Sequence, residues 1–186
     1  MTRSLLAPVL AFAALLTGEA AAAQTQACVA PADLGDGVVY AMPIAYEAVR
    51  SACANRLARD GFISARGEGF ITPFRARQDA AWPGAFRLLK TFMASDPKNA
   101  GNGGPDMLAM LSSMPEDALR PFVDAMIGQV IAEEIKGDDC SRIERGVELI
   151  SPLPIENVGG LVAFIAEMAD LKNPSICPTA AGAPRK

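Results

Sequence analysis

Apolar residues recur three or four positions apart through most of this chain, a spacing that places them on one side of an α-helix. Proline and glycine separate these periodic stretches. The pattern predicts helices over residues 43–60, 82–95, 105–112, 116–135, 139–150 and 154–168. We therefore expect an all-α fold, a single-domain bundle of five or six helices.

The last two helices form the clearest unit of this pattern. The first of them should begin at Asp138 or Asp139, because either carboxylate can accept a hydrogen bond from a free first-turn N–H. The two prolines in residues 151–154 stop this helix and start the next one. We expect an antiparallel C-terminal helical hairpin. Its apolar stripes are Ile143, Val147 and Ile150 in the first helix, then Ile155, Val158, Leu161, Val162, Ile165 and Met168 in the second.

Two adjacent glycines, Gly159 and Gly160, lie in the first turns of that second helix. Glycine costs about 1 kcal/mol relative to alanine inside a helix, so the pair needs a reason. One interpretation is that another helix packs closely against a surface without side chains. The alternative is a ligand pocket at this position.

The N-terminal half is less regular. Residues 24–41 predict an irregular arm, whereas the helix over residues 43–60 turns Cys53 inward along with its apolar neighbours. Residues 62–81 remain open between a small β-hairpin and a functional loop that carries Glu68. Residues 96–106 are rich in glycine and asparagine and predict a linker. Ser113 and Glu116 fit a capping box at the start of the following helix.

The first 23 residues have the features of a secretory signal peptide. A short apolar run follows Arg3, and three alanines end the segment before the expected cleavage after Ala23. We expect residues 1–23 to be a signal peptide, residues 24–177 to be the helical domain and residues 178–186 to be a disordered tail. The mature chain, without a transmembrane segment, should be periplasmic or secreted.

Four cysteines in an exported chain predict two disulfides. An antiparallel hairpin would bring Cys140 at one open end beside Cys177 at the other. Cys28 then has only Cys53 as its partner. The predicted pairing is therefore Cys140 with Cys177 and Cys28 with Cys53.

Charge is unevenly distributed, although the net charge is only −4. Eight basic residues and three acids lie between Arg50 and Lys90, and acids dominate after Asp96. Arg66, Arg75 and Arg77 form a candidate patch for an anionic envelope component. The alternative is that basic and acidic faces attract each other within one fold. The modest acidic charge gives no reason to expect nucleic-acid binding.

The chain contains no histidine. This absence excludes the Ser-His-Asp and Cys-His nucleophile systems and histidine-ligated metal sites. We assign no catalytic residue, metal or cofactor, and lean against an enzyme. The leading hypothesis is an exported module that binds a protein or an envelope component. The alternatives are a carboxylate-dependent hydrolase of an envelope polymer, using Glu68, and a chaperone-like protein that exposes Met107, Met110 and Met114.

Overall fold

The structure, a computed structural model, describes residues 28–95, 109 and 113–178. Its helices within these residues are α1 (Pro31–Ala52), α2 (Phe62–Ser95), α5 (Glu116–Glu134), the 3-10 helix η1 (Gly137–Asp139), α6 (Cys140–Ile150) and α7 (Ile155–Met168). The described part of the chain contains isolated β-bridges and no strand. The prediction of an all-α fold with five or six helices is confirmed.

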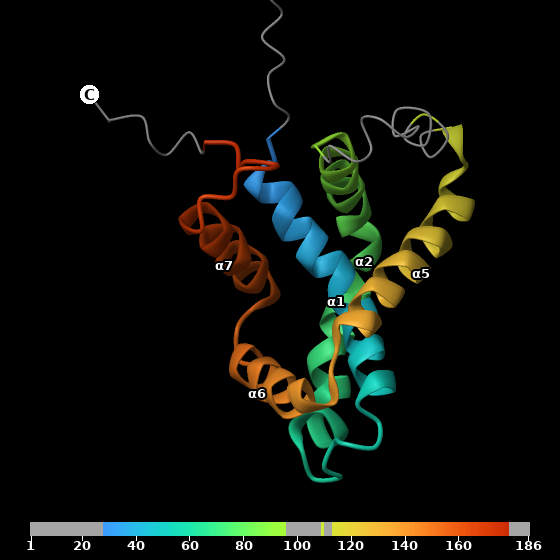
Figure 1. The fold of residues 1–186 in the computed structure, drawn as a ribbon, viewed down its shortest axis with the longest axis vertical. Coiled ribbons are helices and arrows are strands. Elements are labelled where there is room, and N and C mark those ends of the chain that lie inside the picture. The colour runs from blue at the N-terminus through green and yellow to red at the C-terminus, as the bar shows by residue number, and fades with distance from the viewer. Residues whose placement is uncertain (1–27, 96–108, 110–112, 179–186) are drawn as a thin grey trace, which may run out of the picture.

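Helix α1 is the centre of the molecule. It packs against α2 along its length, against α7 on one side and against α5 on the other (Figure 1). α6 lies across the far end and contacts α2. The remaining helices are thus arranged around α1, and α7 and α5 lie at opposite edges of the fold.

Two apolar clusters hold the helices on α1. The first joins Tyr46 and Val49 of α1, and Cys53 just after it, to buried residues of α2, α6 and α7. The second contains Tyr40 of α1, Trp82 of α2 and the buried face of α5. Trp82 stacks on Phe86 and is almost fully buried, so the only tryptophan belongs to the core.

Helix α1 begins at Pro31, twelve residues before the predicted start at Pro43. Residues 31–41 are helical, not an irregular arm, because Val38 and Val39 pack against the two clusters and outweigh the low helix propensity of the glycines nearby. Pro43 lies inside the helix. The helix also ends early, at Ala52, with Cys53 as its C-cap. Cys53 points inward as predicted and is fully buried.

The segment 62–81 is neither a hairpin nor a loop. It is the first part of α2, one helix of 34 residues that continues through Pro73 and Pro83. Both prolines are exposed, so each lies on the outer side of the helix. Ile63, Ile71 and Phe74 recur at helical spacing and are buried against α1. This burial offsets the hydrogen bonds that the prolines cannot make.

Helix α5 has a different N-cap from the predicted one and leaves part of its apolar surface exposed. Its N-cap is Pro115, whose carbonyl oxygen accepts the first helical hydrogen bonds from Ala118 and Leu119, so the N-cap lies two positions after the predicted cap at Ser113. Its apolar residues are divided between a buried side and an exposed side. Leu119 and Val123 are buried, whereas the large apolar side chains left exposed are Phe122, Met126 and Val130.

The C-terminal helices meet at the predicted proline corner, between Ile150 and Ile155. The start at Asp139 is confirmed, since Asp139 is the N-cap of α6. The predicted hydrogen bond from the first turn of α6 to its carboxylate is not formed, and the carboxylate accepts one from the backbone N–H of Lys136 instead. The two helices are bent by 118° and do not fold back side by side. The start of α6 and the end of α7 therefore lie at different ends of the molecule (Figure 1).

The two disulfides join Cys28 to Cys177 and Cys53 to Cys140. Two bridges were predicted correctly, but the predicted pairing is wrong because the corner opens too wide for Cys140 to reach Cys177. Cys28 lies just before α1, where Val29 pairs with the segment that follows α7. The two bridges thus fasten the two ends of α1 to the C-terminal part of the chain.

Several predicted segments lie outside the described residues. They are the signal peptide of residues 1–23, the linker of residues 96–106, most of the predicted helix over residues 105–112, and the tail beyond residue 178.

Candidate functional site

Helix α7 has small residues on its buried side and large ones on its outer side. Val158, Gly159, Ala163 and Ala166 are buried, and α7 packs along α1. A Cβ atom added to Gly159 would lie 3.0 Å from the Cα of Gly35 in α1. The backbones of the two helices touch at this point. The close-packing interpretation of the glycine pair is therefore confirmed for Gly159.

The opposite side of α7 carries large apolar side chains in contact with solvent. We define the α7 outer face as Leu161, Phe164, Ile165 and Met168. Phe164 and Ile165 are each 56% exposed, and Met168 is 70% exposed. Their spacing of three, four and seven places them on one side of the helix. Such a row is unusual on a soluble surface and typically marks a contact site.

The sequence-based stripe for α7 is only partly right. Val158 is buried and Ile155 packs against the first cluster, but the remaining four members of the stripe are exposed: Leu161, Val162, Ile165 and Met168. A second pattern identifies the buried side better. Gly159, Ala163 and Ala166 recur at helical spacing, and small residues on one side indicate a close helix–helix contact. Reading that pattern would have assigned the large residues to the outside.

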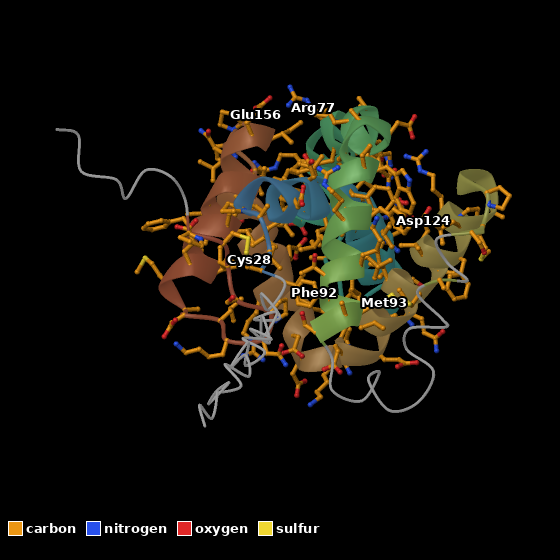
Figure 2. All side chains as sticks on the ribbon, turned by 90° about the horizontal axis from the view of Figure 1, so that it is seen from above. Cys28, Arg77, Phe92, Met93, Asp124 and Glu156 are labelled. Atoms are coloured by element: carbon orange, nitrogen blue, oxygen red, sulfur yellow. A yellow bond between two sulfur atoms is a disulfide. The ribbon has the colours of Figure 1, made fainter. Side chains whose placement is uncertain are left out.

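The charged residues of α7 are all acidic. Glu156 and Glu167 lie within the helix, and it contains no lysine or arginine. Glu156 forms an ion pair with Arg77 of α2, and Figure 2 shows the two side chains meeting at one edge of the molecule. Glu167 has no such partner in the described part of the chain. The α7 outer face therefore lies on a helix whose charged residues are all acidic.

The three arginines of the predicted patch lie on α2 and connect it to three different helices. Arg66 pairs with Glu148 of α6 at 2.7 Å, Arg75 pairs with Glu47 of α1 at 2.6 Å, and Arg77 pairs with Glu156 of α7. Each positive charge thus has an acidic partner within the fold. That these arginines bind an anionic envelope component stays a prediction.

Glu68 lies on the exposed side of α2 in the same network of charges. Its carboxylate accepts hydrogen bonds from Arg75 at 2.7 Å and from Arg50 at 3.1 Å. The hydrogen bond from Arg75 holds the pKa of Glu68 below its usual range. A general acid of a hydrolase needs a raised pKa, so this environment gives the hydrolase hypothesis no support.

A second polar cluster connects α1, α2 and α5. The buried Tyr40 hydroxyl donates a hydrogen bond to Asp124 of α5 at 2.6 Å (Figure 2 labels Asp124). Arg120 of α5 pairs with Asp79 at 2.9 Å and lies over the ring of Trp82. Burial, followed by the hydrogen bond to Asp124, raises the pKa of Tyr40. A tyrosine that holds its proton so firmly is a structural donor, not a base.

Other predicted features are only partly covered by the structure. Met114 is half-buried against the second cluster, while Met107 and Met110 lie outside the described residues. Among the described residues, no group of three histidine, cysteine, aspartate or glutamate side chains could hold a metal ion. No single described helix has the length and apolar character to cross a membrane. Among the described helices, only one bent pair has both when taken together: η1 continued by α6 is its first member, and α7 is its second.

Comparison with known proteins gives no relative from which a function could be inferred. The chain matches no protein-family model, no curated protein and no solved structure.

Proposed function

We propose that this chain is an exported binding module whose contact surface is the α7 outer face. One observation carries the proposal: α7 buries its small residues and exposes Leu161, Phe164, Ile165 and Met168. Exposing large apolar side chains gives up the free energy that their burial would provide, about 1.5–3 kcal/mol for each full side chain. A partner that covers them would recover part of this free energy.

The spacing of these residues supports a helix as the occupant. Leu161, Phe164 and Met168 follow one another by three and four positions, the spacing of the seam in a helix–helix contact. α7 lies at the edge of the fold in both views, so a second helix could approach along its axis (Figures 1 and 2). The partner would be an amphipathic helix of another protein.

The charge of α7 supports a basic partner. Glu156 and Glu167 are its only charged residues, and Glu156 is already paired with Arg77. Glu167 has no ion-pair partner among the described residues, and a helix with lysine or arginine beside its apolar stripe would complement it. An anionic lipid surface would be repelled by the same carboxylate. We therefore commit to one occupant, a basic amphipathic helix.

The test is direct binding of synthetic peptides to the full exported chain, measured by fluorescence anisotropy. The first peptide is about 18 residues long, with leucine at the seam positions and lysine beside them. The second is identical except that glutamate replaces lysine. We expect the lysine peptide to bind at least about tenfold more tightly, with the difference shrinking as salt is added.

A matched pair of variants locates the site. Phe164→Ser together with Met168→Ser should weaken binding of the lysine peptide by about tenfold or more. Phe122→Ser on α5 is the control, because Phe122 is 53% exposed, nearly as much as Phe164. Equal binding by all three proteins would overturn the proposal. Self-association of the unmodified chain, lost in the double variant, would instead assign the α7 outer face to a second copy.

A further inference from the structure

A cleft lies between the inner edge of α7 and helices α1 and α2. It is separate from the α7 outer face. It has a volume of about 450 Å³, within the range of ligand pockets. Its walls are small and apolar and include Gly35, Val39, Ala81, Ile155 and Gly160. The cleft exists because α1 and α7 touch at Gly35 and Gly159, where neither helix carries a side chain to fill the space beside the contact. Close helix packing thus explains Gly159, and the cleft lies where the alternative interpretation of the glycine pair expected a pocket.

Three charged residues line this cleft: Asp36, Arg77 and Glu156. Arg77 and Glu156 neutralise each other across the cleft through their ion pair (Figure 2). Asp36 is half-buried and has no hydrogen-bond or ion-pair partner among the described residues. It lies so close to Gly84 of α2 that any side chain there would collide with its carboxylate. The cleft therefore contains one carboxylate that is not used by the fold.

The surroundings of Asp36 favour a positive charge beside it. Burial raises its pKa, and the neighbouring Asp33 raises it further, while Arg87 acts in the opposite direction. Arg87 is itself held by Asp33 through a 2.6 Å ion pair, so it does not bind Asp36 directly. A bound cation would remove the cost of keeping Asp36 ionised in a largely apolar site.

We propose that this cleft binds a small organic cation, a molecule with one protonated amine and a compact apolar body. The ammonium group lies against Asp36, and the apolar body fills the space between Val39, Ile155 and the two glycine positions of α7. A metal ion does not fit this site, since the described residues supply no group of three metal ligands. An organic anion would face Asp36 without a free positive partner, because Arg77 is already paired.

The experiment uses three probes of similar size: hexylamine, 1-hexanol and hexanoate. Each is titrated into the full chain, and backbone amide signals are followed by two-dimensional NMR. We expect hexylamine to shift the amide signals of Gly35, Gly159 and Gly160, with an affinity at least about tenfold above that of the neutral and anionic probes. Equal shifts by all three probes would mean that the cleft takes apolar molecules without selecting an amine, and would overturn the proposal.

Two variants test the two halves of the site separately. Asp36→Asn should reduce hexylamine affinity by about tenfold and leave the hexanol shifts unchanged, whereas Glu47→Gln, on the same helix but outside the cleft, should change it by less than about threefold. Gly160→Leu fills the open space beside Gly160 without altering a charge and should abolish binding of hexylamine. Retained binding in both Asp36→Asn and Gly160→Leu would rule out the cleft as the site.

Discussion

Gly159 and Gly160 are adjacent in sequence but differ in what surrounds them. A Cβ at Gly159 would lie 3.0 Å from the Cα of Gly35 and 3.1 Å from its carbonyl oxygen, both rigid backbone atoms. A Cβ at Gly160 would meet nothing within 4 Å. At one position glycine is required by space, while at the other it lowers helix propensity and leaves the adjacent cleft open.

Alanine at these two positions should therefore act in opposite directions. Gly159→Ala forces α7 away from α1, which costs about 1–3 kcal/mol, only partly offset by about 1 kcal/mol of helix propensity. Gly160→Ala gains helix propensity without a steric clash, so the fold should be stabilised by up to about 1 kcal/mol. Urea unfolding followed by circular dichroism measures both values. Equal effects of the two substitutions would show that α1 and α7 do not touch at Gly159.

At the scale of elements, α5 is fastened to α1 by both apolar and polar contacts. Leu119 and Val123 supply the buried apolar face. The 2.6 Å hydrogen bond from Tyr40 to Asp124 adds a charged acceptor. Tyr46, the only other tyrosine, makes a longer bond of 3.3 Å to the uncharged carbonyl oxygen of Ile63. The two tyrosines thus form a natural comparison.

Removing the Tyr40 hydroxyl should cost more than removing that of Tyr46. Tyr40→Phe loses a hydrogen bond to a charged group and should cost about 1.5–3 kcal/mol, against about 0.5–1.5 kcal/mol for Tyr46→Phe.

Above about pH 10 an unfolded tyrosine loses its proton. Folded Tyr40 keeps its proton because its pKa is raised, so the unfolded state binds fewer protons and stability falls as pH rises. Urea midpoints between pH 7 and about 11 should decline less steeply in Tyr40→Phe than in the unmodified chain. An identical slope in both proteins would contradict the assignment.

Helix formation itself was predictable from sequence in some elements and not in others. The corner before Ile155 and the start of α6 followed from local signals, namely two prolines and Asp139 as a cap. The second part of α2 was predicted as a helix over residues 82–95, but its first part was missed because prolines and glycines interrupt the apolar pattern of residues 62–81. Its helical state depends on packing of Ile71 and Phe74 against α1, which no local signal records. The α7 outer face was missed for a different reason, since the stripe of large apolar residues predicted the buried side, whereas the small residues of α7 lie against α1.

At the scale of the whole molecule, the two disulfides fasten opposite ends of α1. Cys53–Cys140 spans 87 positions and its sulfur atoms are buried with the first cluster. Cys28–Cys177 spans 149 positions, and both of its cysteines are only half-buried. The pairing was not predictable from sequence, because it depends on the 118° angle between α6 and α7, which the proline corner does not specify.

The difference in burial predicts an order of reduction. A thiolate must reach a sulfur atom to attack a disulfide, so Cys28–Cys177 should open at a lower dithiothreitol concentration than Cys53–Cys140. Brief treatment of the folded chain, alkylation and mass spectrometry of non-reduced peptides measure both the order and the pairing. Opening of Cys53–Cys140 first would mean that the first cluster is more accessible than the structure indicates. Loss of each bridge should destabilise the fold by up to about 5 kcal/mol on the chain-entropy model.

The position of Cys28–Cys177 also has a mechanical consequence. The Cα atoms of these residues lie 4.9 Å apart, although 149 positions separate them in the chain. A tension applied to the chain on either side of this point passes through the covalent sulfur–sulfur bond and bypasses every helix between them. While the bridge is closed, stretching cannot extend the helices. Once it is opened by a reductant while Cys53–Cys140 stays closed, the same tension acts on α1, α6 and α7 directly.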